Sequence, residues 1–195
     1  MKEIVFATNN SHKLDELRAI AGDGVRVISL AELGCHDDIP EDGETLTDNA
    51  LAKARWVHER YGVACLADDT GLEVDALEGA PGVHTARYAG PGHDAAANVE
   101  LLLHNLNGVE PDRRTARFRT VMAYIAKDGT ERTFDGVVEG VITGERRGTD
   151  GFGYDPVFRP AGWTGTFAEA GPDAKNAVSH RGRAARAFLQ FFEQQ

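Results

Sequence analysis

Cysteine and long apolar runs are scarce in this chain of 195 residues. The two cysteines, Cys35 and Cys65, stand thirty positions apart with no CxxC pair or Cys/His cluster, which argues against a disulfide framework and structural zinc. A reducing cytoplasm is therefore the expected location. No apolar run approaches the roughly 20 residues of a membrane-spanning helix. The N-terminal segment MKEIVFATNN, which contains an acid, is too brief for a signal peptide.

The chain also lacks an excess of basic residues. Its net charge of −10 argues against a general nucleic-acid coat protein, which needs a basic surface. The charge is uneven: residues 1–100 hold 8 Lys and Arg against 19 Asp and Glu (−11), and residues 101–195 hold 13 against 12 (+1). An acidic first half can supply metal ligands and the second half cations, although a solvated acidic surface explains the same composition.

Internal repeats, low-complexity linkers and the glycine patterns GxxxxGK[ST] and GxGxxG are also absent, so neither a P-loop nor a Rossmann dinucleotide site is supported. Periodicity predicts strands over residues 2–7, 25–28, 63–67, 116–126, 130–142 and 157–158. It predicts helices from near 12 to 21, from 45 to 61, over 94–106 and after 179. Alternating strands and helices, then a hairpin with an Asp-Gly turn, predict an α/β fold with a mixed sheet.

The stretch 63–90 contains the densest polar pattern. Its apolar start is read as a buried strand that ends at Asp68 and Asp69, followed at once by Thr70 and Gly71. Neighbouring acids on a strand point to opposite faces, so one can reach a cleft while the other anchors the turn. A carboxylate beside a hydroxyl suits a hard metal ion with a phosphate ligand. An ordinary solvated turn would use the same residues.

Two polar helix starts and one aromatic loop add to this pattern. The segment 8–13 places backbone N–H groups, hydroxyls and Lys13 at a helix N-terminus, which favours anions but also describes a plain cap. The segment 151–156 sets Phe152 between two glycines, where a planar ligand can approach the backbone, or where a ring can simply pin a loop. Lys175 and the segment 179–182 supply further cations and donors.

Five stretches together carry a family resemblance: ATNNSHK at 7–13, LADDTGLEVDAL at 66–77, GAPGVHTARYAG at 79–90, GFGYDPVF at 151–158 and AVSHRGRA at 177–184. In that order, across nearly the whole chain, they resemble the inosine/xanthosine triphosphate pyrophosphatase family. The resemblance implies Mg²⁺-dependent hydrolysis of dITP, ITP and XTP to the monophosphate and pyrophosphate, which keeps these nucleotides out of DNA and RNA.

The resemblance also implies a fold and an assembly. The expected fold is a single domain over 1–195, elongated and two-lobed, with a central mixed twisted β-sheet flanked by helices and an active site in the cleft between the lobes. A homodimer is expected, with a purine nucleoside triphosphate as substrate and neither a nucleic-acid polymer nor a membrane as partner.

Site residues follow from the same resemblance, motif by motif. The triphosphate would be bound by Thr8, Asn9, Asn10, Ser11, His12 and Lys13, with Lys53 and Thr70 also touching phosphate. Glu41 and Asp69 would hold Mg²⁺, and Asp69 would also accept the proton of the attacking water. Phe152 would stack on the purine with Gly153, Tyr154 and Asp155 beside it, and the base and its 6-oxo group would be reached by Lys175, His180 and Arg181.

Some assignments stay open. Asn9 stands where many members have Gly, Thr70 where Ser is common, and the loop that offers Glu41 also offers Asp38, Asp42 and Glu44. A relative acting on modified pyrimidine triphosphates, a sensing module that binds without hydrolysis, and a general phosphatase are the other readings. Phe152 argues for purines, and the acid pair with Lys53 argues for catalysis. The ranking of ITP, dITP and XTP, and Mg²⁺ against Mn²⁺, are not decided by the residues.

Overall fold

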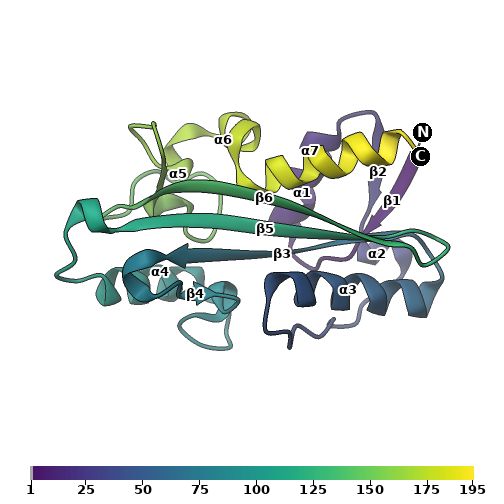
Figure 1. Cartoon of the computed structure of the whole chain (residues 1–195), viewed down its shortest axis with the longest axis horizontal. Helices are drawn as coiled ribbons and strands as arrows, with labels where there is room; N and C mark the ends of the chain where they lie inside the picture. Colours follow the sequence, from purple (N-terminus) through teal and green to yellow (C-terminus); the bar gives the residue numbers. More distant parts are fainter. Residues whose placement is uncertain (1) are drawn as a thin grey trace. The chain divides into compact units, whose positions relative to one another are not determined.

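The computed structural model describes residues 2–195 and is shown in Figure 1. Its strands are β1 (Lys2–Phe6), β2 (Val25–Ile28), β3 (Cys65–Val74), β4 (Pro81–Gly82), β5 (Thr115–Ile125), β6 (Glu131–Ile142) and β7 (Phe158–Pro160). Its α-helices are α1 (Ser11–Ala21), α2 (Leu30–Leu33), α3 (Leu46–Tyr61), α4 (Ala95–Asn105), α5 (Phe167–Ala170), α6 (Pro172–Val178) and α7 (His180–Glu193). Short 3₁₀ helices cover Asp75–Leu77, Thr85–Arg87, Pro111–Arg113 and Asp155–Val157.

The sheet is mixed, as predicted. Its strand order is β2-β1-β3-β5-β6-β7, with β4 paired to β3. Strand β1 runs parallel to both β2 and β3, whereas the pairs β3–β4 and β6–β7 are antiparallel. The α/β class with a mixed sheet flanked by helices is therefore confirmed. Among residues 2–195, no helix combines the length and the apolar content that a bilayer crossing requires.

The chain divides into two compact units. The first unit holds the residues up to Asp69, Thr120–Gly136 and His180–Gln195, and the second holds Thr70–Arg119 and Val137–Ser179. Strands β3, β5 and β6 contribute residues to both units. The expected cleft between two lobes, and the single domain, stay predictions.

The core of the first unit lies between the sheet and two helices. Ile4 and Phe6 of β1 pack with Leu17 of α1 and with Phe188 and Leu189 of α7. In Figure 1 α7 lies on one side of the sheet of the first unit and α3 lies on the other side. Burial of each such side chain contributes about 1.5–3 kcal/mol, so this core fixes both helices against the strands.

The second unit has its own core. Leu72 and Val74 of β3 pack with Val99 of α4 and with Phe118 and Phe158. The rings of Phe118 and Phe158 meet edge to face with centroids 4.7 Å apart, a favourable aromatic geometry. The unit therefore has the buried apolar contacts that hold its loops in place.

One sequence prediction is wrong. The Asp68–Gly71 segment is not a turn at a strand exit, because β3 continues through it to Val74. Two buried apolar side chains, Leu72 and Val74, continue the strand beyond the acids, and β4 pairs with it at Leu72 and Glu73. The polar residues are a break in the apolar pattern and not in the strand.

Candidate active site

The N-terminus of α1 is built by Asn10. The backbone N–H of Lys13 donates to Asn10 Oδ1 at 3.2 Å, so Asn10 is the N-cap and the helix begins at Ser11. Upstream, the backbone N–H of Asn10 donates to Thr8 Oγ1 at 3.2 Å, and Asn9 Nδ2 donates to the carbonyl of Asp37 at 3.4 Å. Asn9, Ser11 and His12 are exposed and Thr8 and Asn10 are half-buried. This arrangement presents the polar turn expected to hold the triphosphate.

Successive side chains of β3 alternate between two sets of partners. Cys65 Sγ donates to the carbonyl of Ala54 in α3 at 2.9 Å, whereas Leu66 lies in the core formed with α1 and α7. The same period of two places Asp68 on the side of α1 and α7 and Asp69 on the side of α3. The expectation that the two acids serve opposite faces is therefore confirmed, although no turn is involved.

Asp68 lies in a buried network of charges. It is fully buried, and its carboxylate accepts from Lys13 Nζ at 3.1 Å and from Arg181 Nε at 3.2 Å. Arg181, 1% exposed, also donates to Glu16 of α1. Burial by itself would raise the pKa of Asp68, but the charges of Lys13 and Arg181 outweigh it and hold that pKa well below its usual value. Asp68 therefore stays ionised and anchors both cations.

Lys13 responds to the same burial in the opposite direction. Loss of solvent lowers the pKa of Lys13 below its usual value, and the attraction of Asp68 offsets this only in part. An additional anion beside Lys13 would favour its charged form.

Asp69 faces a different set of partners on α3. Asn49 Nδ2 donates to Asp69 Oδ2 at 3.0 Å, and Lys53 Nζ lies 3.9 Å from Asp69 Oδ1. Lys53 also donates to Glu41 Oε1 at 2.5 Å, so one ammonium lies beside both expected metal ligands. Burial raises the pKa of Asp69, and the charge of Lys53 offsets this only in part. For Glu41, burial also acts upward, but Lys53 outweighs it and lowers the pKa.

The donor set fits a hard divalent cation. No group of three or more His, Cys, Asp or Glu side chains within residues 2–195 is arranged to hold a metal ion. Mg²⁺ does not need one, because it is usually bound through one or two carboxylates and keeps its other positions for water and phosphate oxygens. Glu41 and Asp69, the two carboxylates beside Lys53 Nζ, offer that number of protein ligands.

A second cluster lies in the second unit around Asp155. Lys175 Nζ donates to Asp155 Oδ2 at 2.6 Å and lies 4.7 Å from the ring centroid of Phe152. The backbone N–H of Phe152 donates to the same carboxylate oxygen at 3.0 Å. Gly151 has φ +74°, and a Cβ there would lie 2.2 Å from Asp155 Oδ2. The glycine therefore permits the tight loop that brings aromatic, anion and cation together.

The remaining expected residues are placed as follows. Tyr154 is buried and its hydroxyl donates to the carbonyl of Thr85 at 2.7 Å, while Gly153 and Thr70 are half-buried. His180 is buried at the start of α7. Gly136 of β6 lets that helix start approach, because a Cβ there would lie 2.0 Å from the carbonyl oxygen of His180. None of the expected roles toward a nucleotide is tested by these contacts, and each stays a prediction.

Two residues with evident structural roles were not among the expected site residues. Glu16 is the second anion of Arg181, and Asn49 is the hydrogen-bond partner of Asp69. Asn49 precedes Lys53 by one helical turn, and that shared face was the available signal in the sequence. Glu16 offered no such signal, because it is 165 positions from Arg181.

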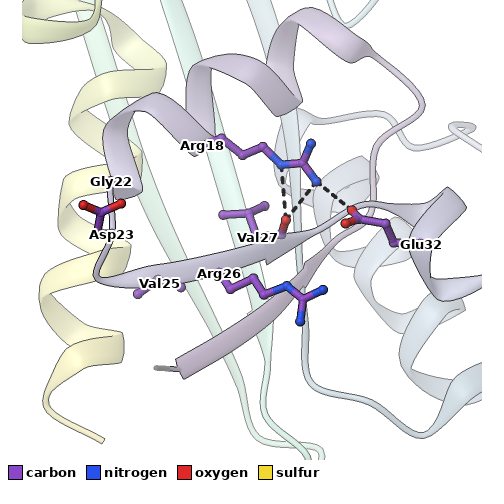
Figure 2. Close-up of a pocket in the computed structure, with 7 residues that line it drawn as sticks. All are labelled: Arg18, Gly22, Asp23, Val25, Arg26, Val27 and Glu32. Atoms are coloured by element: carbon purple, nitrogen blue, oxygen red, sulfur yellow. Dashed lines mark hydrogen bonds and ion pairs between the residues drawn. The ribbon is translucent and has the colours of Figure 1, made fainter.

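A separate pocket of about 290 Å³ lies elsewhere in the first unit (Figure 2). It is lined by Arg18, Gly22, Asp23, Val25, Arg26, Val27 and Glu32. Arg18 donates to the carbonyl of Val27 and to Glu32, so its guanidinium is held by the wall of the pocket. The pocket includes none of the expected site residues.

Comparisons with known proteins agree with the geometry. The model of the Ham1 family matches residues 4–191. A dITP/XTP pyrophosphatase of Porphyromonas gingivalis is 53% identical over 98% of this chain and 97% of its own length, and one of Bacillus subtilis is 43% identical over 99% and 98%.

Solved structures give the same result. A HAM1 protein from Coxiella burnetii has a TM-score of 0.89 at 38% identity and covers all of both chains, and the Staphylococcus aureus Ham1 protein has a TM-score of 0.88 at 37% identity over 99% of each chain. The family match spans the residues of both clusters. This chain therefore belongs to the Ham1 family.

Proposed function

We propose that this protein is a nucleoside triphosphate pyrophosphatase that hydrolyses dITP, ITP and XTP to the monophosphate and pyrophosphate. One observation carries the proposal: Glu41, Lys53 and Asp69 lie together, with Lys53 Nζ 2.5 Å from Glu41 and 3.9 Å from Asp69. Two carboxylates beside a cation suit the handling of a polyphosphate. The names of the relatives, dITP/XTP pyrophosphatases at 41–53% identity, support the substrate class.

In the first unit, the charged residues would have different roles toward the triphosphate. Lys13 and Lys53 would neutralise phosphate oxygens, and the polar turn at 8–12 would bind further oxygens through its N–H groups and hydroxyls. Asp69 would take the proton of a water that attacks the α-phosphorus in line, so that pyrophosphate leaves. Asp68, tied to Lys13 and Arg181, would hold this constellation without taking part in proton transfer.

Mg²⁺ is the proposed cofactor, held by Glu41 and Asp69. When bound, it supplies positive charge to the phosphates and polarises a water molecule. The Asn49 hydrogen bond occupies Oδ2 of Asp69, which leaves Oδ1 on the side of Lys53 and Glu41.

In the second unit, Phe152 would stack on the purine, with Lys175 and Asp155 beside the ring supplying a donor and an acceptor. Donors that face a 6-oxo group would disfavour adenine, whose amino group leaves them unpaired at about 1–3 kcal/mol for each buried donor. His180 and Arg181 are proposed to contribute to base recognition as the family resemblance implies. A homodimer and a cytoplasmic location belong to the proposal on the same ground.

Product analysis tests the function directly. ITP, XTP, dITP, ATP and GTP are each incubated with the protein in Mg²⁺ and in EDTA, and the released phosphate species are identified. We expect monophosphate and pyrophosphate from ITP, XTP and dITP only, with no turnover in EDTA. Orthophosphate as the product, or equal rates on ATP and GTP, would contradict the proposal. Asp69→Asn serves as the matched inactive variant and should retain nucleotide binding.

A further inference from the structure

Asn49 makes two hydrogen bonds in opposite directions from a buried position. The residue is 1% exposed, the backbone N–H of Gly43 donates to its Oδ1 at 2.7 Å, and its Nδ2 donates to Asp69 Oδ2 at 3.0 Å. A backbone N–H can only donate, so the amide oxygen must face Gly43 and the amide nitrogen must face the carboxylate. The orientation of the side chain is thus determined by its partners.

These two bonds join the acidic loop to the acidic strand. Gly43 lies two residues after Glu41, and Asp69 lies in β3. Lys53 lies one turn further along α3 and makes a second connection between the loop and the strand. Its ammonium pairs with Glu41 and also lies beside the carboxylate of Asp69. One face of α3 therefore contacts both proposed metal ligands, through a neutral amide and through an ammonium.

The loop is built for this approach. A Cβ on Gly43 would lie 2.7 Å from Asn49 Oδ1 and 2.8 Å from Asp48 Cβ, so a side chain at position 43 would push the loop off the helix. No positive φ is involved at Gly43, and close approach is the reason for the glycine. Loss of either partner would break the hydrogen bond that joins this part of the loop to α3.

We propose that Asn49 is a positioning residue that assembles Glu41 and Asp69 into one ligand pair before any nucleotide arrives. It does so by binding Oδ2 of Asp69, which directs Oδ1 toward Glu41, and by holding the backbone of the loop that carries Glu41. The inference rests on the proposed function for the identity of the ligand, a divalent cation. Groups that orient metal ligands typically change metal affinity or activity by about 10–100-fold when they are removed.

The chain offers a matched control in the second unit. Asn98 of α4 is 3% exposed, accepts from the backbone N–H of Ala89 at 2.7 Å and donates to the carbonyl of Ala86 at 3.0 Å. It is the same kind of buried amide that ties a loop to a helix, but the group that accepts from its Nδ2 is a backbone carbonyl and not a carboxylate. Asn98→Leu therefore reports the structural cost of losing such an amide.

The test compares Asn49→Leu, Gly43→Ala, their double variant and Asn98→Leu with the unaltered protein. Mn²⁺ alone is titrated into each nucleotide-free protein, and the free ion is counted by electron paramagnetic resonance. The Mg²⁺ concentration that gives half-maximal turnover of dITP, together with kcat and KM, is then measured. Urea unfolding of every variant separates a change in the site from a loss of fold.

We expect Asn49→Leu and Gly43→Ala each to weaken Mn²⁺ binding about tenfold or more and to raise the half-saturating Mg²⁺ concentration similarly. In both variants kcat should fall by a larger factor than the factor by which KM changes. The double variant should lose little beyond Asn49→Leu, because that change already removes the hydrogen bond that Gly43→Ala disturbs. Asn98→Leu should lose stability and leave Mn²⁺ binding as it is.

Three results would overturn the inference: Mn²⁺ affinity unchanged in Asn49→Leu, an equal loss in Asn98→Leu, or no Mn²⁺ binding by the unaltered nucleotide-free protein. Failure of the proposed function looks different. In that case the unaltered protein releases no pyrophosphate from any oxo-purine triphosphate, whatever the Mn²⁺ titration gives.

Discussion

Asp68→Asn should destabilise the protein strongly, although it only replaces one carboxylate oxygen with an NH₂ group. The carboxylate of Asp68 is fully buried and accepts from two cations, Lys13 at 3.1 Å and Arg181 at 3.2 Å. An asparagine keeps the volume but has one acceptor oxygen and no charge, so at least one buried cation faces an amide N–H or nothing. Breaking a buried ion pair from one side costs about 3–5 kcal/mol.

The loss should depend on pH with a definite sign. The pKa of Asp68 is depressed in the folded protein, so its ionisation stabilises the fold above the unfolded-state pKa of about 3.9 and ceases to do so as the pH falls below it. The difference between Asp68→Asn and the unaltered protein should therefore be full at pH 7 and should shrink as the pH falls from about 4 toward 2.

Urea unfolding followed by circular dichroism, at pH 7 and at pH 3, measures both effects. Asp75→Asn is the control, because Asp75 also accepts from an arginine, Arg117, but that ion pair is solvent-exposed and should be worth about 1 kcal/mol or less. The reasoning fails if Asp68→Asn lies within about 0.5 kcal/mol of the unaltered protein at pH 7.

Two further predictions concern the base cluster and a buried thiol. Phe152→Ala should raise KM for oxo-purine triphosphates with little loss of stability, since the ring is half-buried; an unchanged KM would remove the stacking role. Burial raises the pKa of Cys65 from 9.0 to about 12, so the free energy of unfolding should decrease between about pH 9 and pH 12, by at most about 1.4 kcal/mol for each pH unit. In Cys65→Ala, the free energy of unfolding measured by urea titration should depend less on pH over this range. An identical pH dependence in both proteins would contradict the assignment to Cys65.

Periodicity was sufficient to predict most of the fold. The helix that begins after Thr45 ends at Tyr61 as expected, and the Asp-Gly turn lies between β5 and β6. These elements are determined by local signals, namely caps, alternation and turn residues, which a sequence displays directly. The sequence predicts too short a strand at β3, because the polar residues in its middle interrupt the apolar pattern. The apolar side chains of Leu72 and Val74 lie beyond that interruption and belong to the same strand.

The candidate site could be predicted less completely, because its contacts join distant residues. Asp68 and Arg181 are 113 positions apart, and no spacing rule connects them. The family resemblance assigns Arg181 to the base, which stays a prediction, and its ion pairs with Asp68 and Glu16 are contacts that no sequence pattern indicates. Short helices such as α6, which carries Lys175 to Asp155 and is separated from α5 by Gly171 alone, have too few residues for a clear period.

The alternation along β3 has a consequence for how the chain can change in length. Asp68 and Asp69 differ only in which side of the strand they occupy, and that side is set by counting residues from Cys65. Insertion or deletion of one residue between Cys65 and Asp68 would exchange the sides on which the two carboxylates lie. Asp68 would then face Lys53, and Asp69 would face Arg181. Single substitutions in this segment alter one contact, but a change of length by one inverts the chemistry of both faces. A change of two residues would restore the faces and shift the pair along the strand by about 7 Å.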